Sequence, residues 1–361
     1  MTVKNVRANF YYFHTTPKKR LGASAFRPQK DSQIVYNVSI DILVEEDDMS
    51  YQKESFTSSD GKSTIAYFIW SPSVPARGVV QIVHGMCEYM GRYSMLAHYL
   101  AEKGYVVCGE DHLGHGQSVG DKDTFGFFGK RGGADFLVED VEKLHQIMKE
   151  SYPGKPYIMF GHSMGSFIVR NWFAKYGNDC DGLILSGTAV APKLLKPLRL
   201  LAKIQRFFVR DRKPATMIAG MINKTYMKKI ENPSTTADWI SYDSEVVKRY
   251  TGDPFCTFTF THAGYIDLFN LLERCNSEEW YKTIPKDKPI LILSGDEDPV
   301  GDYGEAPQKI YNKLIESGQG RVTLDIRHGM RHEPHNEIGH EAIFQRYVAY
   351  LFDNFVRKAG T

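Results

Sequence analysis

Three features that mark other classes of protein are missing from this chain of 361 residues. Its five cysteines are scattered and form no CxxC pair, which argues against a disulfide framework and fits a reducing cytoplasm. It has no run of about eighteen apolar residues, so we expect no membrane-spanning helix. The formal net charge of only +2 gives no general attraction to nucleic acid. We therefore predict a cytoplasmic protein that does not bind nucleic acid.

Residues 1–48 differ in composition from the remainder of the chain. Residues 1–30 are basic without any acidic residue, whereas residues 41–48 (DILVEEDD) are acidic. The segment lacks the apolar stretch of a secretory signal. We interpret residues 1–48 as a loosely attached leader, as chain termini often are. Because a regular strand–turn–strand pattern begins at Met49, the alternative hypothesis is that Met49 is the native start and the leader is not native.

From residue 49 onward, continuous apolar segments alternate with amphipathic ones. This alternation predicts an α/β fold in which helices cover both faces of a mostly parallel sheet. The expected strands are 78–85, 105–111, 156–163, 181–187, 289–295 and 321–329, and the expected helices are 93–104, 134–154, 164–177 and 336–358. Residues 190–285 contain no buried-strand pattern. We therefore predict a core of residues 49–189 and 286–361, with residues 190–285 inserted as a helical cap over the strand ends that bind ligands.

The segment FGHSMG (160–165) fits the pattern G-x-S-x-G and lies between an expected strand and an expected helix. This context is typical of a nucleophilic serine on a tight turn, where side chains larger than those of Gly161 and Gly165 would clash. We predict that Ser163 is a nucleophile. Its oxyanion hole would use the backbone N–H of Met164, at the helix start, and that of Met86, in the HGMCEY loop after the strand 78–85.

A nucleophilic serine needs an acid and a base, which follow it along the chain in that order in such folds. Two loops offer candidates, namely the acids Asp296, Glu297 and Asp298 and the bases His328, His332 and His335. A zinc site is the competing interpretation of the histidines. However, HEPH is one residue short of HExxH, and Pro334 argues against the helix that HExxH requires. We therefore expect no metal.

The segments VQIVHGMCEYMGRY, EDHLGHGQS, GHSMGS, LSGDEDPVG and MRHEPHNE together resemble the α/β-hydrolase fold. Within that superfamily the chain resembles the monoacylglycerol lipase and lysophospholipase-like branch, also called the serine aminopeptidase S33 group, over about residues 50–358. The resemblance implies the triad Ser163, Asp298 and His332, with Met86 and Met164 as backbone oxyanion donors. It implies no cofactor. It also gives Arg92, Tyr93 and the segment 111–116 a structural role around the pocket.

The cap resembles this branch around DWISYD and DPFCTFTFTHAGYIDLFNLL. The resemblance implies a lid with an aromatic lining, and its substrate-facing candidates are Trp239, Phe260, Tyr265 and Phe269. Core packing is the alternative for each of them. The segment 194–210 is basic and amphipathic, and its expected apolar face carries Leu194, Leu198, Leu201, Ile204 and Phe208. This face would cover the acyl pocket, or alternatively the helix would dock transiently on a lipid surface.

The predicted function is therefore a serine hydrolase that cleaves monoacylglycerol- or lysophospholipid-like carboxylic esters through an acyl-enzyme. Its partner would be a small ester or lipid substrate. Peptidases, amidases and short-chain esterases can use the same fold and triad, so these activities are alternatives. A non-catalytic ligand-binding relative is a third alternative. The sequence leaves the acyl chain length, the head group and the oligomeric state open.

Overall fold

The computed structural model describes residues 51–120, 125–209 and 211–357. All of them belong to one compact unit, Asp48–Thr361. The expected leader, residues 1–48, lies outside the described residues.

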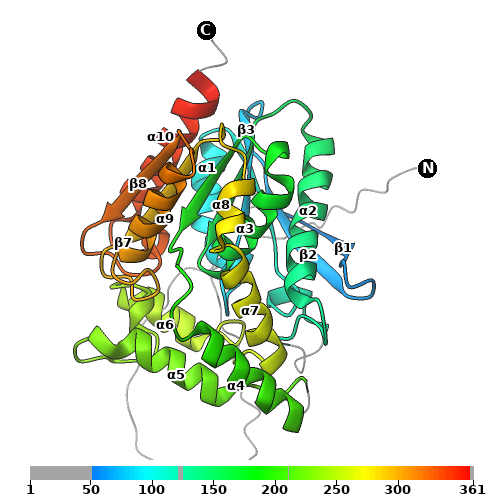
Figure 1. Cartoon of the computed structure of the whole chain (residues 1–361). Helices are drawn as coiled ribbons and strands as arrows, with labels where there is room; N and C mark the ends of the chain where they lie inside the picture. The colour runs from blue at the N-terminus through cyan, green and yellow to red at the C-terminus, as the bar shows by residue number, and fades with distance from the viewer. Residues whose placement is uncertain (1–50, 121–124, 210, 358–361) are drawn as a thin grey trace, which may run out of the picture. The chain divides into compact units, whose positions relative to one another are not determined.

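One eight-stranded sheet forms the centre of the described unit (Figure 1). Its spatial order is β1-β2-β4-β3-β5-β6-β7-β8. The strands are β1 (Gln52–Thr57), β2 (Thr64–Trp70), β3 (Gly78–Val83), β4 (Tyr105–Glu110), β5 (Tyr157–His162), β6 (Gly182–Ser186), β7 (Ile290–Gly295) and β8 (Val322–Arg327). The pairs β1–β2 and β2–β4 are antiparallel, and all the later pairs are parallel. The prediction of a mostly parallel sheet is confirmed.

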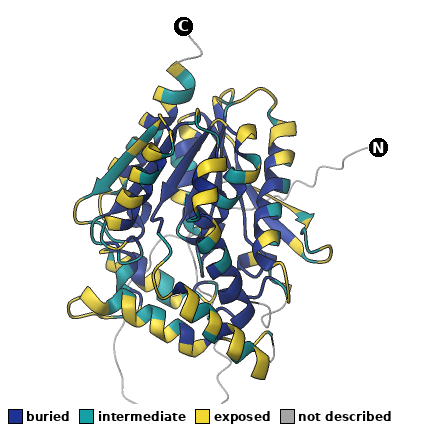
Figure 2. Cartoon of the chain, viewed as in Figure 1, coloured by how far each residue is buried: buried dark blue, intermediate teal, exposed yellow. Residues whose placement is uncertain are grey.

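Helices cover both faces of the sheet. On one face lie α1 (Ser94–Glu102) and α10 (His340–Leu351), which the π-helical turn Phe352–Val356 extends. On the other lie α2 (Gly133–Ser151), α3 (Met164–Tyr176) and α9 (Glu305–Glu316). Successive side chains of a strand point to opposite faces, and β7 shows the consequence. Ile290 and Ile292 join one core cluster, while Leu291 and Leu293 join the other. The central strands are accordingly buried throughout (Figure 2).

The segment between β6 and β7 is helical. It contains α4 (Leu195–Phe208), α5 (Thr216–Tyr226), α6 (Ser244–Gly252), α7 (His262–Arg274) and α8 (Glu278–Thr283). Helices α4, α5 and α6 lie across one end of the sheet (Figure 1). Helix α7 packs against α2 and α3 as well as α4, and α8 packs against α3. The last part of the inserted segment therefore joins the layer that covers the sheet, and the first part forms the cap over the strand ends.

The expected apolar face of α4 is wrong in part. Leu194, Ile204 and Phe208 were expected on the inward face, but they are 65%, 49% and 78% exposed. The buried side chains are instead Leu195 and Ala202. The physical reason is that the helix carries two apolar stripes and packs against α7. The stripe with Leu195 and Ala202 joins the core cluster that contains Phe269 and Leu272 of α7. Among the described residues, no helix is both long and apolar enough to cross a bilayer.

Candidate active site

Ser163 lies on the turn that joins β5 to α3, and its backbone has the unusual conformation φ 51°, ψ −121°. A non-glycine residue in such a region costs about 1–3 kcal/mol, which the surrounding structure must offset. The flanking glycines explain how the turn fits. A Cβ on Gly161 would lie 2.7 Å from the carbonyl oxygen of Gly165, and a Cβ on Gly165 would lie 1.9 Å from that of Val83. Only glycine therefore fits at both positions.

Asp298 and His332 form a buried hydrogen-bonded pair, with 3.0 Å between His332 Nδ1 and Asp298 Oδ1. The backbone N–H of Val300 also donates to Asp298 Oδ1, at 2.8 Å. Because a carboxylate only accepts, the His332 proton lies on Nδ1 and the lone pair on Nε2. Burial alone would lower the pKa of His332, but the Asp298 carboxylate outweighs it and the pKa is raised. This arrangement suits a base that must become an imidazolium during a reaction.

The other histidines of the segment 328–340 have different surroundings. His328 is exposed and hydrogen-bonds Asp296, with 2.7 Å between Nδ1 and Oδ2. His335 is buried and stacks on Tyr93 at 4.8 Å between ring centroids. His340 pairs through Nδ1 with the carbonyl oxygen of Glu337 at 3.0 Å. Of these four histidines, only His332 lines the pocket that contains Ser163.

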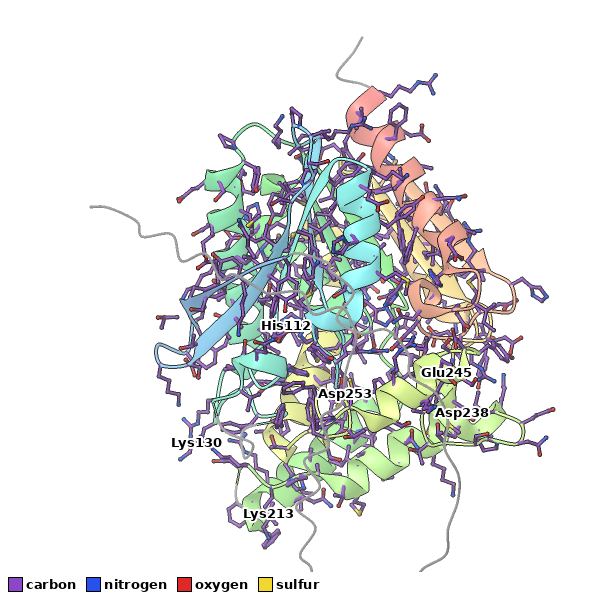
Figure 3. The ribbon with its side chains drawn as sticks, turned by 180° about the vertical axis from the view of Figure 1, so that it is seen from behind. His112, Lys130, Lys213, Asp238, Glu245 and Asp253 are labelled. Carbon is purple, nitrogen blue, oxygen red and sulfur yellow. The ribbon has the colours of Figure 1, made fainter. Side chains whose placement is uncertain are left out.

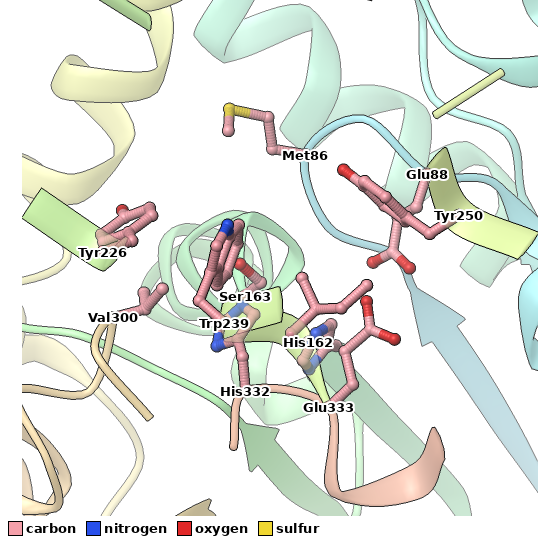
Figure 4. A pocket seen from close by; sticks show the side chains of 11 residues that line it. Met86, Glu88, His162, Ser163, Tyr226, Trp239, Tyr250, Val300, His332 and Glu333 are labelled. Atoms are coloured by element: carbon pink, nitrogen blue, oxygen red, sulfur yellow. The ribbon is translucent and has the colours of Figure 1, made fainter. Parts of the chain in front are cut away.

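This pocket receives residues from both the core and the cap (Figure 4). Its lining consists of Met86, Glu88, His162, Ser163, Tyr226, Trp239, Ile240, Tyr250, Val300, His332 and Glu333. Of the four aromatic candidates, Trp239 lines the pocket, 5.1 Å from the His332 ring and 4.8 Å from Tyr226. Phe260, Tyr265 and Phe269 lie instead in the core beneath it, each at most 4% exposed.

Sequence reasoning did not single out seven of the lining residues: Glu88, His162, Tyr226, Ile240, Tyr250, Val300 and Glu333. Glu88 and Glu333 could have been predicted as lining residues, because they lie in the loops that the sequence assigned to the oxyanion donor and the base. No local sequence pattern marks the cap residues Tyr226 and Tyr250 as lining residues, since only the packing of the cap brings them to the pocket.

The expected oxyanion donors come from two different elements. Met164 is the first residue of α3, so its N–H belongs to the helix N-terminus directly after Ser163. Met86 follows Gly85 in the loop after β3, and its side chain lines the pocket. The backbone at Gly85 approaches the nucleophile closely, because a Cβ built there would lie 3.0 Å from the Cβ of Ser163. The loop that carries Met86 thus passes close to Ser163.

Arg92 joins the loop that carries Met86 to the loop that carries His332. Its guanidinium donates to Glu88 Oε2 at 2.8 Å and bidentately to Glu333 at 2.8 and 2.6 Å. Both glutamates are buried. Burial raises the pKa of Glu88 although Arg92 opposes the shift, whereas at Glu333 Arg92 prevails over burial and lowers the pKa to about 2. Arg92 thus binds both glutamates, with the bidentate contact to Glu333, the neighbour of His332.

The described residues contain no group of three or more histidine, cysteine or acidic side chains placed to hold a metal ion. The chemistry available at the pocket is that of a serine hydroxyl, an imidazole, a carboxylate and backbone N–H groups.

The fold and the serine turn define an α/β-hydrolase. A protein-family model described as "Serine aminopeptidase, S33" matches residues 74–339, and the chain belongs to this family. It is 29% identical over 308 residues to a monoacylglycerol lipase of Mycolicibacterium smegmatis, covering 84% of this chain and 98% of the relative. It is 27% identical to a monoglyceride lipase of Mus musculus, covering 78% and 83% of the two chains.

Solved structures also match this fold. A thermostable carboxyl esterase from Bacillus coagulans in complex with glycerol superposes with a TM-score of 0.80 and 32% identity, covering 85% of this chain and 99% of the esterase. A monoglyceride lipase of Saccharomyces cerevisiae has a TM-score of 0.66 at 22% identity, covering 84% and 95%, and supports the fold alone. The chain is thus a carboxylic ester hydrolase of the α/β-hydrolase superfamily.

Arg92→Met should lower the free energy of unfolding by about 3–5 kcal/mol, because it leaves buried carboxylates without their cation. Urea denaturation measures the loss. Arg274→Met is the matched control, since Arg274 pairs with Asp135 at the surface. It should cost less than about 1 kcal/mol. Equal losses in the two variants would contradict a structural role for the buried pair.

Proposed function

We propose that the protein hydrolyses carboxylic esters through a Ser163–His332–Asp298 triad. The observation that carries the proposal is the buried Asp298–His332 pair, which reaches the same pocket as a serine on a strained strand-to-helix turn. A serine hydroxyl is a weak nucleophile, and a neighbouring imidazole with a free Nε2 can accept its proton as it attacks. Asp298 then stabilises the imidazolium.

Each remaining step has a group available to it. The tetrahedral oxyanion accepts hydrogen bonds from the backbone N–H groups of Met86 and Met164. The imidazolium of His332 gives its proton to the departing alcohol, which leaves an acyl group on Ser163. Water then attacks this acyl-enzyme with His332 again as base, releasing the carboxylic acid.

For the substrate we propose a monoacylglycerol- or lysophospholipid-like ester. The names of the relatives from Mycolicibacterium smegmatis and Mus musculus support the first. The pocket lining supports a molecule with one polar and one apolar part. Glu88, Tyr226 and Tyr250 offer polar groups that can bind hydroxyls, while Met86 and Val300 offer apolar surface.

Ser163→Ala and His332→Ala should each lower kcat by a factor of about 10⁴ or more, because neither nucleophile nor base can be replaced by water. Steady-state hydrolysis of a soluble ester measures the effect. His328→Ala is the matched control. His328 lies in the same loop as His332 and also pairs with an aspartate, Asp296, but it is exposed. This variant should retain activity within about twofold. Esterase activity that survives in folded Ser163→Ala protein would refute the mechanism.

A substrate panel separates the proposed activity from its alternatives. We expect a higher kcat/KM for a monoacylglycerol than for a short aryl ester, and no detectable turnover of an aminoacyl amide. The reason is that the pocket combines hydroxyl-binding groups with apolar surface. Preference for the amide would establish a peptidase or amidase instead. A fluorophosphonate that fails to label Ser163 in folded protein would favour a ligand-binding role.

We also propose that the outer surface of the cap contacts anionic lipid transiently. On α4, Leu200, Ile204, Phe207 and Phe208 are 59%, 49%, 85% and 78% exposed. On α5, Met217 and Met221 are about half exposed. The exposed lysines Lys196 and Lys203 lie on the same helix, along one edge of this stripe. Figure 2 shows the exposed surface running along both helices. Exposed apolar side chains beside lysines are the pattern that binds a lipid surface with anionic head groups.

The double variant Phe207→Ser, Phe208→Ser should bind vesicles of phosphatidylcholine and phosphatidylglycerol at least about 10-fold more weakly, because two large apolar side chains no longer enter the bilayer surface. Vesicle co-sedimentation measures this. Turnover of a soluble ester should stay unchanged. Ile315→Ser, which removes an exposed apolar side chain on α9 rather than on the cap, is the control. Undiminished vesicle binding by the double variant would exclude this surface.

A further inference from the structure

Three buried histidines lie behind the loop that carries Met86. His84 follows β3, and His112 and His115 follow β4 (Figure 3 labels His112). The ring of His84 is 3.9 Å from that of His112 and 5.2 Å from that of His115, between centroids. All three are at most 1% exposed. None lines the pocket or takes part in the chemistry proposed above.

The hydrogen bonds of His84 determine which of its nitrogens carries the proton. The backbone N–H of His112 donates to Nε2 of His84 at 3.0 Å, so Nε2 is the acceptor. Nδ1 therefore carries the proton and donates to the carbonyl oxygen of Gly85 at 2.9 Å. Burial and the neighbouring histidines hold the pKa of His84 well below its usual value, which keeps the ring neutral in this single tautomer.

The same reasoning extends to His112 and to Glu110, at the end of β4. Nε2 of His112 faces the carbonyl oxygen of His84 at 3.1 Å and must donate to it, because a carbonyl only accepts. Nδ1 of His112 lies 3.1 Å from Oε1 of the fully buried Glu110. The carboxylate of Glu110 therefore contacts the ring nitrogen of His112 that does not bind His84. This contact restricts the position of the His112 ring.

These contacts orient one peptide bond, that between Gly85 and Met86. Its carbonyl oxygen is bound by His84, and Glu88 Oε1 accepts from the N–H of Gly85. In a trans peptide the C=O and the following N–H point in opposite directions. With the Gly85 oxygen turned toward His84, the N–H of Met86 points away from the histidines. Met86 and Ser163 line the pocket, whereas none of the three histidines does.

We propose that Glu110, His112 and His84 are positioning residues for the oxyanion donor at Met86. The proposal rests on the proposed function, in which that N–H binds the oxyanion. The three side chains touch neither substrate nor nucleophile. They connect the end of β4 to the Gly85–Met86 peptide and keep it from rotating, so that the donor is in place before the transition state forms.

The test compares Glu110→Leu with Glu110→Gln. Glutamine keeps a polar group of the same shape beside Nδ1 of His112 without the charge, whereas leucine removes the polar contact. The readout is the inhibition constant of a trifluoromethyl ketone, whose adduct with the serine places an oxyanion in the hole, set against KM for the ester. Glu110→Leu should weaken inhibition and lower kcat, each by at least about 10-fold, while KM stays within about threefold of the parent. The reason is that complete loss of an oxyanion donor lowers kcat by a factor of about 10²–10³. Glu110→Gln should stay within about threefold of the parent.

His84→Leu, which removes the donor to Gly85 directly, should behave like Glu110→Leu and serves if that variant does not fold. The matched control is Glu142→Leu, since Glu142 forms another buried pair with His145 at 3.1 Å, on α2. It should lower the melting temperature without changing the ratio of ketone inhibition to KM. Unchanged ketone inhibition in folded, active Glu110→Leu and His84→Leu proteins would overturn the inference. So would an equal change in Glu142→Leu. Activity in Ser163→Ala would instead refute the proposed function itself.

Discussion

The ion pairs that Arg92 makes with Glu88 and Glu333 are the interactions on which the geometry of the pocket depends. The bidentate pairing of Arg92 with Glu333 fixes the residue next to His332, and its bond to Glu88 fixes the side chain that binds the N–H of Gly85. The loops that carry His332 and Met86 follow strands far apart in the sequence, and one planar cation joins them. Guanidinium suits this task because its rigid fork can satisfy two carboxylates at once.

The cap is tied to the same loop, so the pocket is not simply covered by a separate lid. The N–H of Glu333 donates to the carbonyl oxygen of Ile240 at 2.8 Å, and Trp239 lies against the ring of His332. Glu337 accepts from the N–H groups of Arg331 and Tyr242, at 2.8 and 2.9 Å. The cap segment around residue 240 therefore supports the histidine loop, while α4 and α5 present apolar side chains outward. The residues that anchor the cap and the residues proposed to contact lipid therefore lie in different parts of the cap.

The sequence predicted best what depends on local chain geometry. Continuous apolar segments predicted the parallel strands, because both faces of such strands are buried, and G-x-S-x-G predicted the turn at Ser163, because a Cβ on Gly165 has no room there. The face of α4 was predicted wrongly, since a helix with two apolar stripes does not reveal which one α7 will cover. Phe260 could not be told from Trp239 as a lining residue for the same reason: both are aromatic cap residues, and only tertiary packing buries one and leaves the other at the pocket.

Two aspartate–histidine pairs in neighbouring positions show why burial, and not residue type, distinguishes the candidate base. Asp296–His328 and Asp298–His332 have nearly the same separation, 2.7 and 3.0 Å, and in both the aspartate raises the pKa of the histidine. The first pair is at the surface, where water screens the interaction, and it does not line the pocket that contains Ser163. The second pair is buried, so the carboxylate's stabilisation of an imidazolium is screened less by water. The same two side chains are thus a surface contact at one position and a candidate acid–base pair two residues further along the aspartate loop and four further along the histidine loop.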